Sequence, residues 1–501
     1  MRRYKIEICT LICVLIIGIL SISSHGLWVD EAVRIQSANY RCSEGFWYHQ
    51  YDHLQIGLCH LQYLWGTLWG KTEIAYRSIN ILFLVVASAY MVLLLRKHGL
   101  SPLWIIVFCV HPICVYYTND ASPYIMLLAC SNAVYYHAFF SERQETWSNS
   151  ALLLGWLLFG FYLHFIYGFV GVLYICSLIW RMCRNKSFSS LRKQIVLALI
   201  FAPFFLFLAY SYMQYMGHGA SRGWDTPGVF NAGVAAYCFI GLGGLGLPRN
   251  DMRMGDFHLV TPYMLSCVMM MLAALIIIIS AGFKKFIACL KEPYVISAIV
   301  LFVVFYIAAF SRNFQFWERH VIFLFPPFFL ILAVTCRDAW TKSPRWLYRS
   351  IIIICGSLLL LSSAQLRWKY IYQKDDLKGA ILHLKTTGYI GSDIPILAQG
   401  NNSLYRYYTC ENYDGDIPET TPPNIRFVNN VSASKIVSAV EELIPSHQEL
   451  VLILTQKDVN EKSFYKEADL VFERKGYAVV SNTDYNTVKI LFLKNKHNLA
   501  L

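Results

Sequence analysis

The chain has 501 residues, of which 56% are hydrophobic and only 15% are charged. Soluble domains carry about 25% charged residues, so this composition excludes a mainly soluble protein and indicates one that crosses a membrane several times. The net charge of +12 does not indicate a nucleic-acid partner, because the basic residues lie in short loops between apolar runs. The 15 cysteines include no Cys-x-x-Cys pair, which excludes a zinc-ribbon or redox motif of that spacing.

Hydropathy predicts about eleven membrane spans, several of them shorter than the roughly 20 residues that a perpendicular helix needs. The first follows a basic stretch and resembles a signal peptide, but it has no clear small-residue cleavage site, so we expect an uncleaved helix. One long apolar run is interrupted only at His164, where we expect two spans to meet. The predicted spans are 8–24, 74–95, 103–118, 123–141, 148–163, 165–180, 195–213, 261–283, 294–310, 320–336 and 347–364.

The distribution of basic residues orients these spans. With the N-terminus on the cytoplasmic side, the inner loops hold 18 Lys and Arg residues, and the outer segments before the C-terminal tail hold 8. This bias supports an odd number of spans and an extracytoplasmic tail. The same topology places acids and histidines from six segments on the outer face, namely Asp30, Glu31, Asp52, His53, Asp120, His164, Asp225, Glu318 and His320.

The stretch Leu27–Ala32, directly after the first span, is the most informative part of that face. It contains Asp30 and Glu31 side by side, and adjacent acids at a membrane surface are costly unless they face water, a metal ion or a substrate. The alternative is a solvated loop in which Trp28 anchors the chain at the interface. Further along, the aromatic stretch Leu58–Trp69 predicts a helix that lies in the interface.

Most of the other polar residues on this face also have a purely structural interpretation. Asp120 lies just before a proline that suits the first turn of a helix, where a carboxylate is a favourable cap. His164 is explained equally well by a helix break, and His53 and Glu318 by solvated loops. Arg319 differs, because a cation is unfavourable at a helix start and suits contact with an anion.

A change in composition predicts two domains, a membrane domain over residues 1–366 and a soluble extracytoplasmic domain over residues 367–501. The tail is polar and rich in turn-forming residues, and it shows no metal, nucleotide or catalytic-triad signature. Its periodicity predicts a small α/β domain. The expected helices are Lys378–Thr386, Ser403–Tyr408 and Ser432–Leu443, the expected strands are Ile394–Ala398 and Leu450–Thr455, and a hairpin is expected from Tyr477–Ser481 and Thr487–Leu493.

An outer face with several acids, a basic residue and an apolar body suits a lipid-borne substrate, such as a sugar linked to polyprenyl phosphate. Transfer of that sugar needs a general base that takes the proton of the incoming hydroxyl or amine. It also needs positive charge to offset the phosphate that leaves. The site must open sideways to lipid and outward to the acceptor.

Several short motifs occur in an order that is typical of one family. Trp28-Val29-Asp30-Glu31-Ala32 resembles the acidic signature of the membrane glycosyltransferases of the C superfold (GT-C). The most similar branch comprises the bacterial relatives of protein O-mannosyltransferases and lipid A aminoarabinose transferases, glycosyltransferase families 39 and 83. The further matches, which extend the likeness over about residues 20–400, are Glu73-Ile74-Ala75-Tyr76-Arg77, Asn119-Asp120-Ala121-Ser122-Pro123-Tyr124, Tyr162-Leu163-His164-Phe165, Glu318-Arg319-His320 and Lys374-Asp375-Asp376-Leu377-Lys378. The chain departs from the family's pattern at His53-Leu54-Gln55, Ser122 and His320, where the family has paired prolines, arginine and tyrosine.

The resemblance implies a polytopic α-helical fold of about eleven transmembrane helices and assigns roles at the outer face. Asp30 is the implied general base for in-line attack at the anomeric carbon with inversion. Glu31 is implied to orient Asp30 or bind the acceptor, and Asp120 to support the same site. The implied substrate-binding residues are His53, His164, Tyr124, Arg319 and Glu318, with Arg319 stabilising the leaving phosphate. The resemblance leaves a divalent metal open, with Asp30, Asp120 and His164 as its ligands, and implies no other cofactor.

The resemblance also implies a location and partners. We expect a bacterial inner membrane, a cytoplasmic N-terminus, a periplasmic C-terminal domain, a polyprenyl-phosphate sugar as donor, a lipid, glycan or protein as acceptor, and no nucleic acid. A lipid-linked-sugar flippase or transporter is one alternative, and it would place ionisable residues at mid-membrane depth. A surface-polysaccharide polymerase or ligase is another, and it would depend on outer-loop arginines such as Arg222, Arg249 and Arg253. A scaffold without activity is the third.

Overall fold

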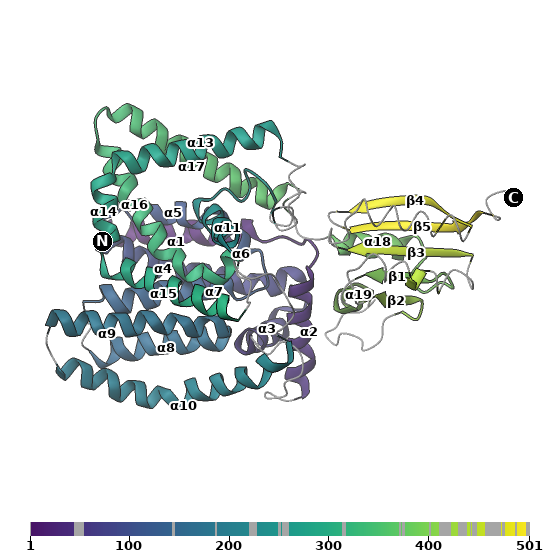
Figure 1. The fold of residues 1–501 in the computed structure, drawn as a ribbon, viewed down its shortest axis with the longest axis horizontal. Helices are drawn as coiled ribbons and strands as arrows, with labels where there is room; N and C mark the ends of the chain where they lie inside the picture. Colours follow the sequence, from purple (N-terminus) through teal and green to yellow (C-terminus); the bar gives the residue numbers. More distant parts are fainter. Residues whose placement is uncertain are drawn as a thin grey trace.

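The molecule consists of a long body of helices that carries a five-stranded sheet at one end (Figure 1). This arrangement confirms the predicted class, a polytopic helical membrane protein with a small α/β domain at its C-terminal end. The computed structural model describes residues 2–44, 55–142, 146–185, 188–219, 228–248, 252, 260–312, 317–369, 372, 376–399, 402–409, 422–428, 438–440, 442, 448–455, 472, 476–485 and 488–496.

Most helices of the helical body run roughly along the longest axis of the whole molecule, with α2 lying across the end that faces the sheet (Figure 1). Its α-helices are α1 (Arg2–Ser21), α2 (Val29–Glu44), α3 (Ile56–Trp69), α4 (Glu73–Lys97), α5 (Trp104–Cys109), α6 (Pro112–Thr118), α7 (Tyr124–Tyr135), α8 (Trp147–Leu163), α9 (Gly171–Asn185), α10 (Phe188–Gly219), α11 (Val229–Ile240), α13 (Pro262–Ala281), α14 (Phe283–Leu290), α15 (Pro293–Ser311), α16 (Phe325–Thr341) and α17 (Arg345–Trp368). Three tighter or wider segments join them, the π-helix η1 (Tyr136–Phe140) and the 3₁₀ helices η2 (Phe165–Val170) and η3 (Glu318–Leu324).

Seven helical stretches in the described residues are long and apolar enough to cross a membrane. They are α4, η2 with α9, α10, α13, α15, η3 with α16, and α17, and shorter apolar helices are formed by α1, α8 and α11. The break predicted at His164 is confirmed, because α8 ends at Leu163 and η2 begins at Phe165. The helix predicted over Leu58–Trp69 is also confirmed, as α3.

One stretch differs from the predicted spans. The span predicted over 103–118 is broken into α5 and α6, because Pro112 has no backbone N–H and begins a new helix that His111 caps through its side chain. Between the spans predicted at 195–213 and 261–283, where the glycine-rich sequence predicts a loop with a re-entrant or interfacial piece, the structure forms the short apolar helix α11, which ends at Gly241 in the left-handed conformation.

Burial separates the central helices from those that face lipid. Helix α7 is buried along its whole length, and it packs against α4, whose own neighbours include α1 and α6. Large apolar side chains on α10 are exposed, among them Leu199, Phe204 and Leu206. A helix that is apolar all round must be covered by protein or by lipid. We therefore assign the exposed face of α10 to the lipid.

The C-terminal sheet has the strand order β2-β1-β3-β5-β4 and is mixed. β1 (Ile396–Gln399) pairs in parallel with β2 (Ile425–Val428) and with β3 (Glu449–Thr455), and β5 (Val488–Asn495) pairs antiparallel with β3 and with β4 (Tyr477–Tyr485). The predicted hairpin is confirmed, although β4 continues to Tyr485. Helices α18 (Leu377–Thr386) and α19 (Asn402–Thr409) also lie where they were predicted. Most of the helix predicted at 432–443 lies outside the described residues.

The apolar core of the sheet domain continues into the helical body. Leu27, Ala32 and Ile35, which precede or lie on α2, belong to the same buried cluster as Leu377 and Tyr408 of the sheet domain. The approach is close at Gly26, where a Cβ atom would lie only 2.8 Å from Cβ of Lys378. A larger residue at position 26 would therefore push the two parts of the molecule apart.

Polar contacts reinforce this junction. The Tyr408 hydroxyl accepts a hydrogen bond from the backbone N–H of Leu27 at 2.6 Å and donates one to Glu73 at 3.3 Å. Burial, with the nearby carboxylate of Glu73, raises the pKa of Tyr408, so the hydroxyl stays protonated and remains a donor. Lys378 pairs with the same Glu73 oxygen at 2.7 Å.

We expect Tyr408→Phe to destabilise the junction. The substitution leaves the buried N–H of Leu27 without its acceptor, which costs about 1–3 kcal/mol. The measurement is the thermal unfolding midpoint in detergent, together with the rate of proteolytic cleavage between α17 and α18. The matched control is Tyr210→Phe on α10, whose side chain is 60% exposed. Equal midpoints for the two variants would show that the Tyr408 hydroxyl contributes nothing.

Candidate active site

Asp30 and Glu31 both lie in the first turn of α2, but their side chains have opposite environments. A carboxylate in that turn is stabilised by the helix dipole. Consecutive helical residues point about 100° apart, so neighbours in sequence do not share a surface. The Glu31 side chain is fully buried, whereas 38% of the Asp30 side chain is exposed. Of the two acids, Asp30 is therefore the one that a substrate can reach.

The Glu31 carboxylate is held by four hydrogen bonds from three parts of the chain. Arg77 on α4 binds it through two parallel contacts, Nε to Oε1 at 3.0 Å and Nη2 to Oε2 at 2.9 Å. The backbone N–H of Ala121 donates to Oε1 at 2.7 Å, and that of Trp28 donates to Oε2 at 3.1 Å. This saturation indicates a positioning role for Glu31 rather than contact with the acceptor.

Arg77 also binds the loop that leads into α2. Its guanidinium donates to the carbonyl oxygens of Ser23, His25 and Gly26 at 3.0, 2.8 and 3.1 Å. A buried ion pair is favourable only when its remaining donors and acceptors are satisfied. Here they are satisfied by the backbone of the loop that leads into α2, so the pair fixes the direction in which α2 starts and the place of Asp30.

The Asp30 carboxylate lies next to two guanidinium groups. Arg319 Nη1 is 3.4 Å from Asp30 Oδ2, and Arg34 Nη2 is 3.7 Å from the same oxygen. Arg34 is one turn further along α2 and its side chain is largely buried. A partly exposed acid is thus placed against two cations that a phosphate could also bind.

Arg319 is held between aromatic rings. Its guanidinium carbon lies 5.8 Å from the ring centre of Trp28 and 6.0 Å from that of Tyr124. Its Nε donates to the ring nitrogen Nε2 of His320 at 3.3 Å. Stacking of this kind orients the planar guanidinium without neutralising its charge. The cation therefore remains able to interact with an anion.

Asp120 is buried and belongs to the same group of side chains. The indole N–H of Trp28 donates to its Oδ1 at 3.4 Å. It does not cap α7, whose cap position is Pro123 with no side-chain hydrogen bond. Trp28 therefore contacts both Asp120 and Arg319. The interpretation of Asp120 as a plain helix cap is wrong.

The remaining predicted residues lie around this group at different distances. Tyr124 is buried, and its ring centre is 6.1 Å from that of His164, which also caps η2 by accepting from the N–H of Ile166 at 3.2 Å. Glu318 is buried and accepts from the hydroxyl of Tyr117 at 2.8 Å, so the interpretation as a solvated loop is wrong for this residue. His53 lies outside the described residues.

The candidate metal ligands are not gathered into a metal site in the described part of the chain. No group of three or more His, Cys, Asp or Glu side chains lies close enough there to hold a metal ion. Asp30 faces guanidiniums, Asp120 faces the indole of Trp28, and one ring nitrogen of His164 accepts from the backbone. As arranged in the described part of the chain, Asp30, Asp120 and His164 do not fit a metal, and we derive no chemical step through one.

Comparison with solved structures places this arrangement in a known fold. The chain superposes on ArnT from Cupriavidus metallidurans in the apo state with a TM-score of 0.54 and 9% identity, covering 98% of both chains. The same protein bound to undecaprenyl phosphate gives a TM-score of 0.52 and 10% identity, covering 97% of both chains. This chain has the ArnT fold. No protein-family model matches the sequence, and no curated protein does.

The ArnT fold brings together residues that the sequence alone did not assign to the site. Arg34 was counted only as an outer basic residue, although its spacing of four from Asp30 is the spacing of a helical ion pair. Trp28 was considered only as an interfacial anchor, and no local pattern shows that its indole joins Asp120 to Arg319. The sequence shows Arg77 as part of a motif but does not indicate that its partner is Glu31.

We expect Glu31→Gln to destabilise the fold, whereas Asp30→Asn is tolerated. The first leaves the Arg77 charge buried without its counter-ion, which costs about 3–5 kcal/mol. The second changes a side chain that is 38% exposed and whose ion-pair contacts, at 3.4 and 3.7 Å, are long, so we expect a smaller loss of stability than for Glu31→Gln. The measurement is the thermal midpoint and the monodisperse fraction after detergent extraction.

The double variant Glu31→Leu with Arg77→Met sharpens this comparison. It removes both charges, so we expect it to recover part of the stability that Glu31→Gln loses. Recovery is incomplete because the loop carbonyls lose their donor. Should Glu31→Gln prove as stable as Asp30→Asn, the buried pair is not what holds α2.

Proposed function

We propose that this chain is an integral-membrane glycosyltransferase that moves a sugar from a polyprenyl-phosphate donor to an acceptor on the extracytoplasmic face. The observation that carries the proposal is the contact of the partly exposed Asp30 carboxylate with Arg319 and Arg34. Sugar transfer from a lipid phosphate needs a base and a cation within reach of the same anomeric carbon. These residues supply both, beside a helical body that is embedded in lipid.

The proposed reaction follows from these positions. The donor phosphate binds Arg319 and Arg34, which frees the Asp30 carboxylate to accept the proton of the acceptor's hydroxyl or amine. The acceptor oxygen or nitrogen then attacks the anomeric carbon in line, the bond to the phosphate oxygen breaks, and the configuration inverts. The guanidiniums stabilise the charge that develops on the leaving phosphate. Trp28 and Tyr124 hold Arg319 in place throughout.

Two observations support a lipid-linked donor over a soluble one. The exposed apolar faces of the helices require lipid around the site's supporting body. In addition, a protein with the same fold, ArnT, has been solved with undecaprenyl phosphate bound. Asp120, His164 and Glu318 support the site from within the protein in this proposal, and His53 is proposed to contact the substrate.

We expect Asp30→Asn to lower transfer by about 10²- to 10⁴-fold, because an amide cannot take up the acceptor's proton. The assay is sugar release from a panel of polyprenyl-phosphate sugars by protein purified into lipid nanodiscs. The matched control is Asp484→Asn, an acid of the sheet domain that pairs with Lys489. Turnover of Asp30→Asn at the wild-type rate would overturn the assignment.

The proposed orientation has a separate test. Eighteen basic residues in the inner loops against eight outside predict a cytoplasmic N-terminus and a periplasmic C-terminal domain in a bacterial inner membrane. We expect alkaline phosphatase fused after the C-terminus to be active in cells, because it folds only in the oxidising periplasm. A fusion protein that is made in full but has no alkaline phosphatase activity would refute this orientation and with it an outer active site.

A further inference from the structure

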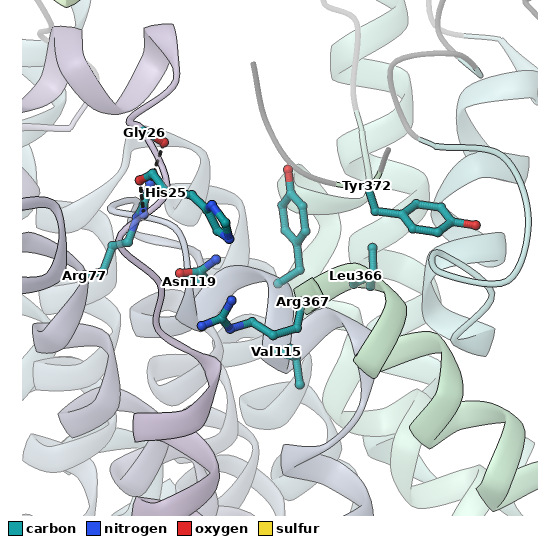
Figure 2. Close-up of a pocket in the computed structure, with 9 residues that line it drawn as sticks. His25, Gly26, Arg77, Val115, Asn119, Leu366, Arg367 and Tyr372 are labelled. Carbon is teal, nitrogen blue, oxygen red and sulfur yellow. Dashed lines mark hydrogen bonds between the residues drawn. The ribbon is translucent and has the colours of Figure 1, made fainter. Parts of the chain in front are cut away.

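A second pocket lies beside Arg77, and none of Asp30, Arg34 and Arg319 lines it (Figure 2). It encloses about 430 Å³ of space that is continuous with the solvent. Its walls come from the loop before α2, the end of α6 and the end of α17, and the residues that matter below are His25, Asn119, Val115 and Arg367.

The pocket carries the positive charge of Arg367, with which no described carboxylate forms an ion pair. Arg367, in the last turn of α17, donates to the carbonyl oxygens of Leu20 at 3.2 Å and Ile22 at 2.7 Å, and no described carboxylate lies within ion-pair distance of it. Its Nη1 makes no hydrogen bond to the described residues. The other cation in the wall, Arg77, is already neutralised by Glu31.

Three nitrogen donors converge on the same space. In Figure 2 the imidazole of His25, the side-chain amide of Asn119 and the guanidinium of Arg367 point toward one another. The Asn119 oxygen is occupied, since it accepts from the N–H and the hydroxyl of Ser23 at 2.8 and 3.0 Å. Its NH₂ group is therefore the part that a ligand can use.

His25 also fits an anion. Partial burial and the charges of Arg367 and Arg77 lower its pKa, so the ring is neutral at neutral pH and offers one N–H donor. Asp376, the acid that acts on His25, caps α18 by accepting from the N–H of Gly379 at 2.9 Å. A cation, an amide and an imidazole around one cavity are the donors that phosphate oxygens prefer.

We propose that this pocket binds the phosphate of an anionic membrane lipid. The lipid source follows from the surroundings of Arg367, where Trp368 is 68% exposed and Leu20 of α1 is 63% exposed. A tryptophan at the end of an apolar helix marks the level of the lipid head groups. A phosphate seated there contacts the loop whose carbonyls Arg77 holds, and so steadies the start of α2 and Asp30. The binding does not depend on the proposed transfer reaction.

The test is a titration of the full-length purified protein with phosphatidylglycerol in detergent, with bound lipid counted by native mass spectrometry. We expect Arg367→Gln to weaken phosphatidylglycerol binding by about tenfold or more, the value of one charge-assisted contact to phosphate. The matched control is Arg349→Gln, an exposed arginine near the other end of the same helix that stacks on Trp340. It is expected to bind the lipid as the wild type does.

Two further titrations decide the chemistry of the ligand. Phosphatidylcholine, whose head group carries its own cation, should bind at least tenfold more weakly, and equal binding would overturn the need for an anion. Glycerol 1-phosphate should also bind more weakly, because it lacks the apolar chains. Equal affinity for glycerol 1-phosphate would overturn the lipid source in favour of a soluble phosphate ester.

A second variant keeps the test decisive if Arg367→Gln does not fold. Val115→Phe fills part of the pocket from α6 and removes no charge. Loss of phosphatidylglycerol binding in Val115→Phe supports the pocket as the site, and unchanged binding overturns it. Lipid binding and sugar transfer are measured in separate assays. The outcome for this proposal is therefore independent of the transfer rate of Asp30→Asn.

Discussion

The buried ion pair of Glu31 and Arg77 is the interaction on which the rest of the site depends. It joins four parts of the chain, namely the loop after α1, the first turn of α2, helix α4 and the loop before α7. Removing two charges from water costs several kcal/mol, and this cost is offset only where each donor and acceptor is matched. The match here uses backbone groups that belong to different segments, so these segments must come together in one arrangement.

That arrangement explains why two adjacent acids differ in burial and in their partners. Once Glu31 points into the protein, the helical rotation of about 100° per residue turns Asp30 toward the edge of the helical body. Asp30 then meets Arg319, which comes from a segment almost 300 positions away in the chain. One carboxylate is used to fix the helix, and the other is left available for a substrate.

The same loop before α2 lies between two groups of nitrogen donors. On one side Arg319 and Arg34 surround Asp30, and on the other Arg367, His25 and Asn119 line the second pocket. Arg77 lies between them, bound to Glu31 on one side and to the loop carbonyls on the other. Both regions lie at the end of the helical body that faces the sheet domain, and both are proposed above to bind phosphate.

The sheet domain contributes to this arrangement through packing. Its core includes Leu27 and Ala32 beside the acidic stretch, and Tyr408 accepts the N–H of Leu27. The start of α2 is therefore held by the hydrogen bonds of Arg77 and by apolar contact with the sheet domain. A change in either contact alters the direction of α2, and with it the distance between Asp30 and Arg319.

The sequence by itself determined the class of the protein, because hydropathy, charge bias and strand periodicity are local properties of the chain. It located most of the helices, the break at His164, the hairpin of the sheet and the acidic pair at Asp30. Only the tertiary structure decided that Glu31 is buried, that Asp120 faces an indole rather than capping a helix, and that Arg34 and Trp28 belong to the site. Those facts depend on partners that are far away in sequence, and the free energy of burying a charge is set by the partners that surround it and not by its neighbours in the chain.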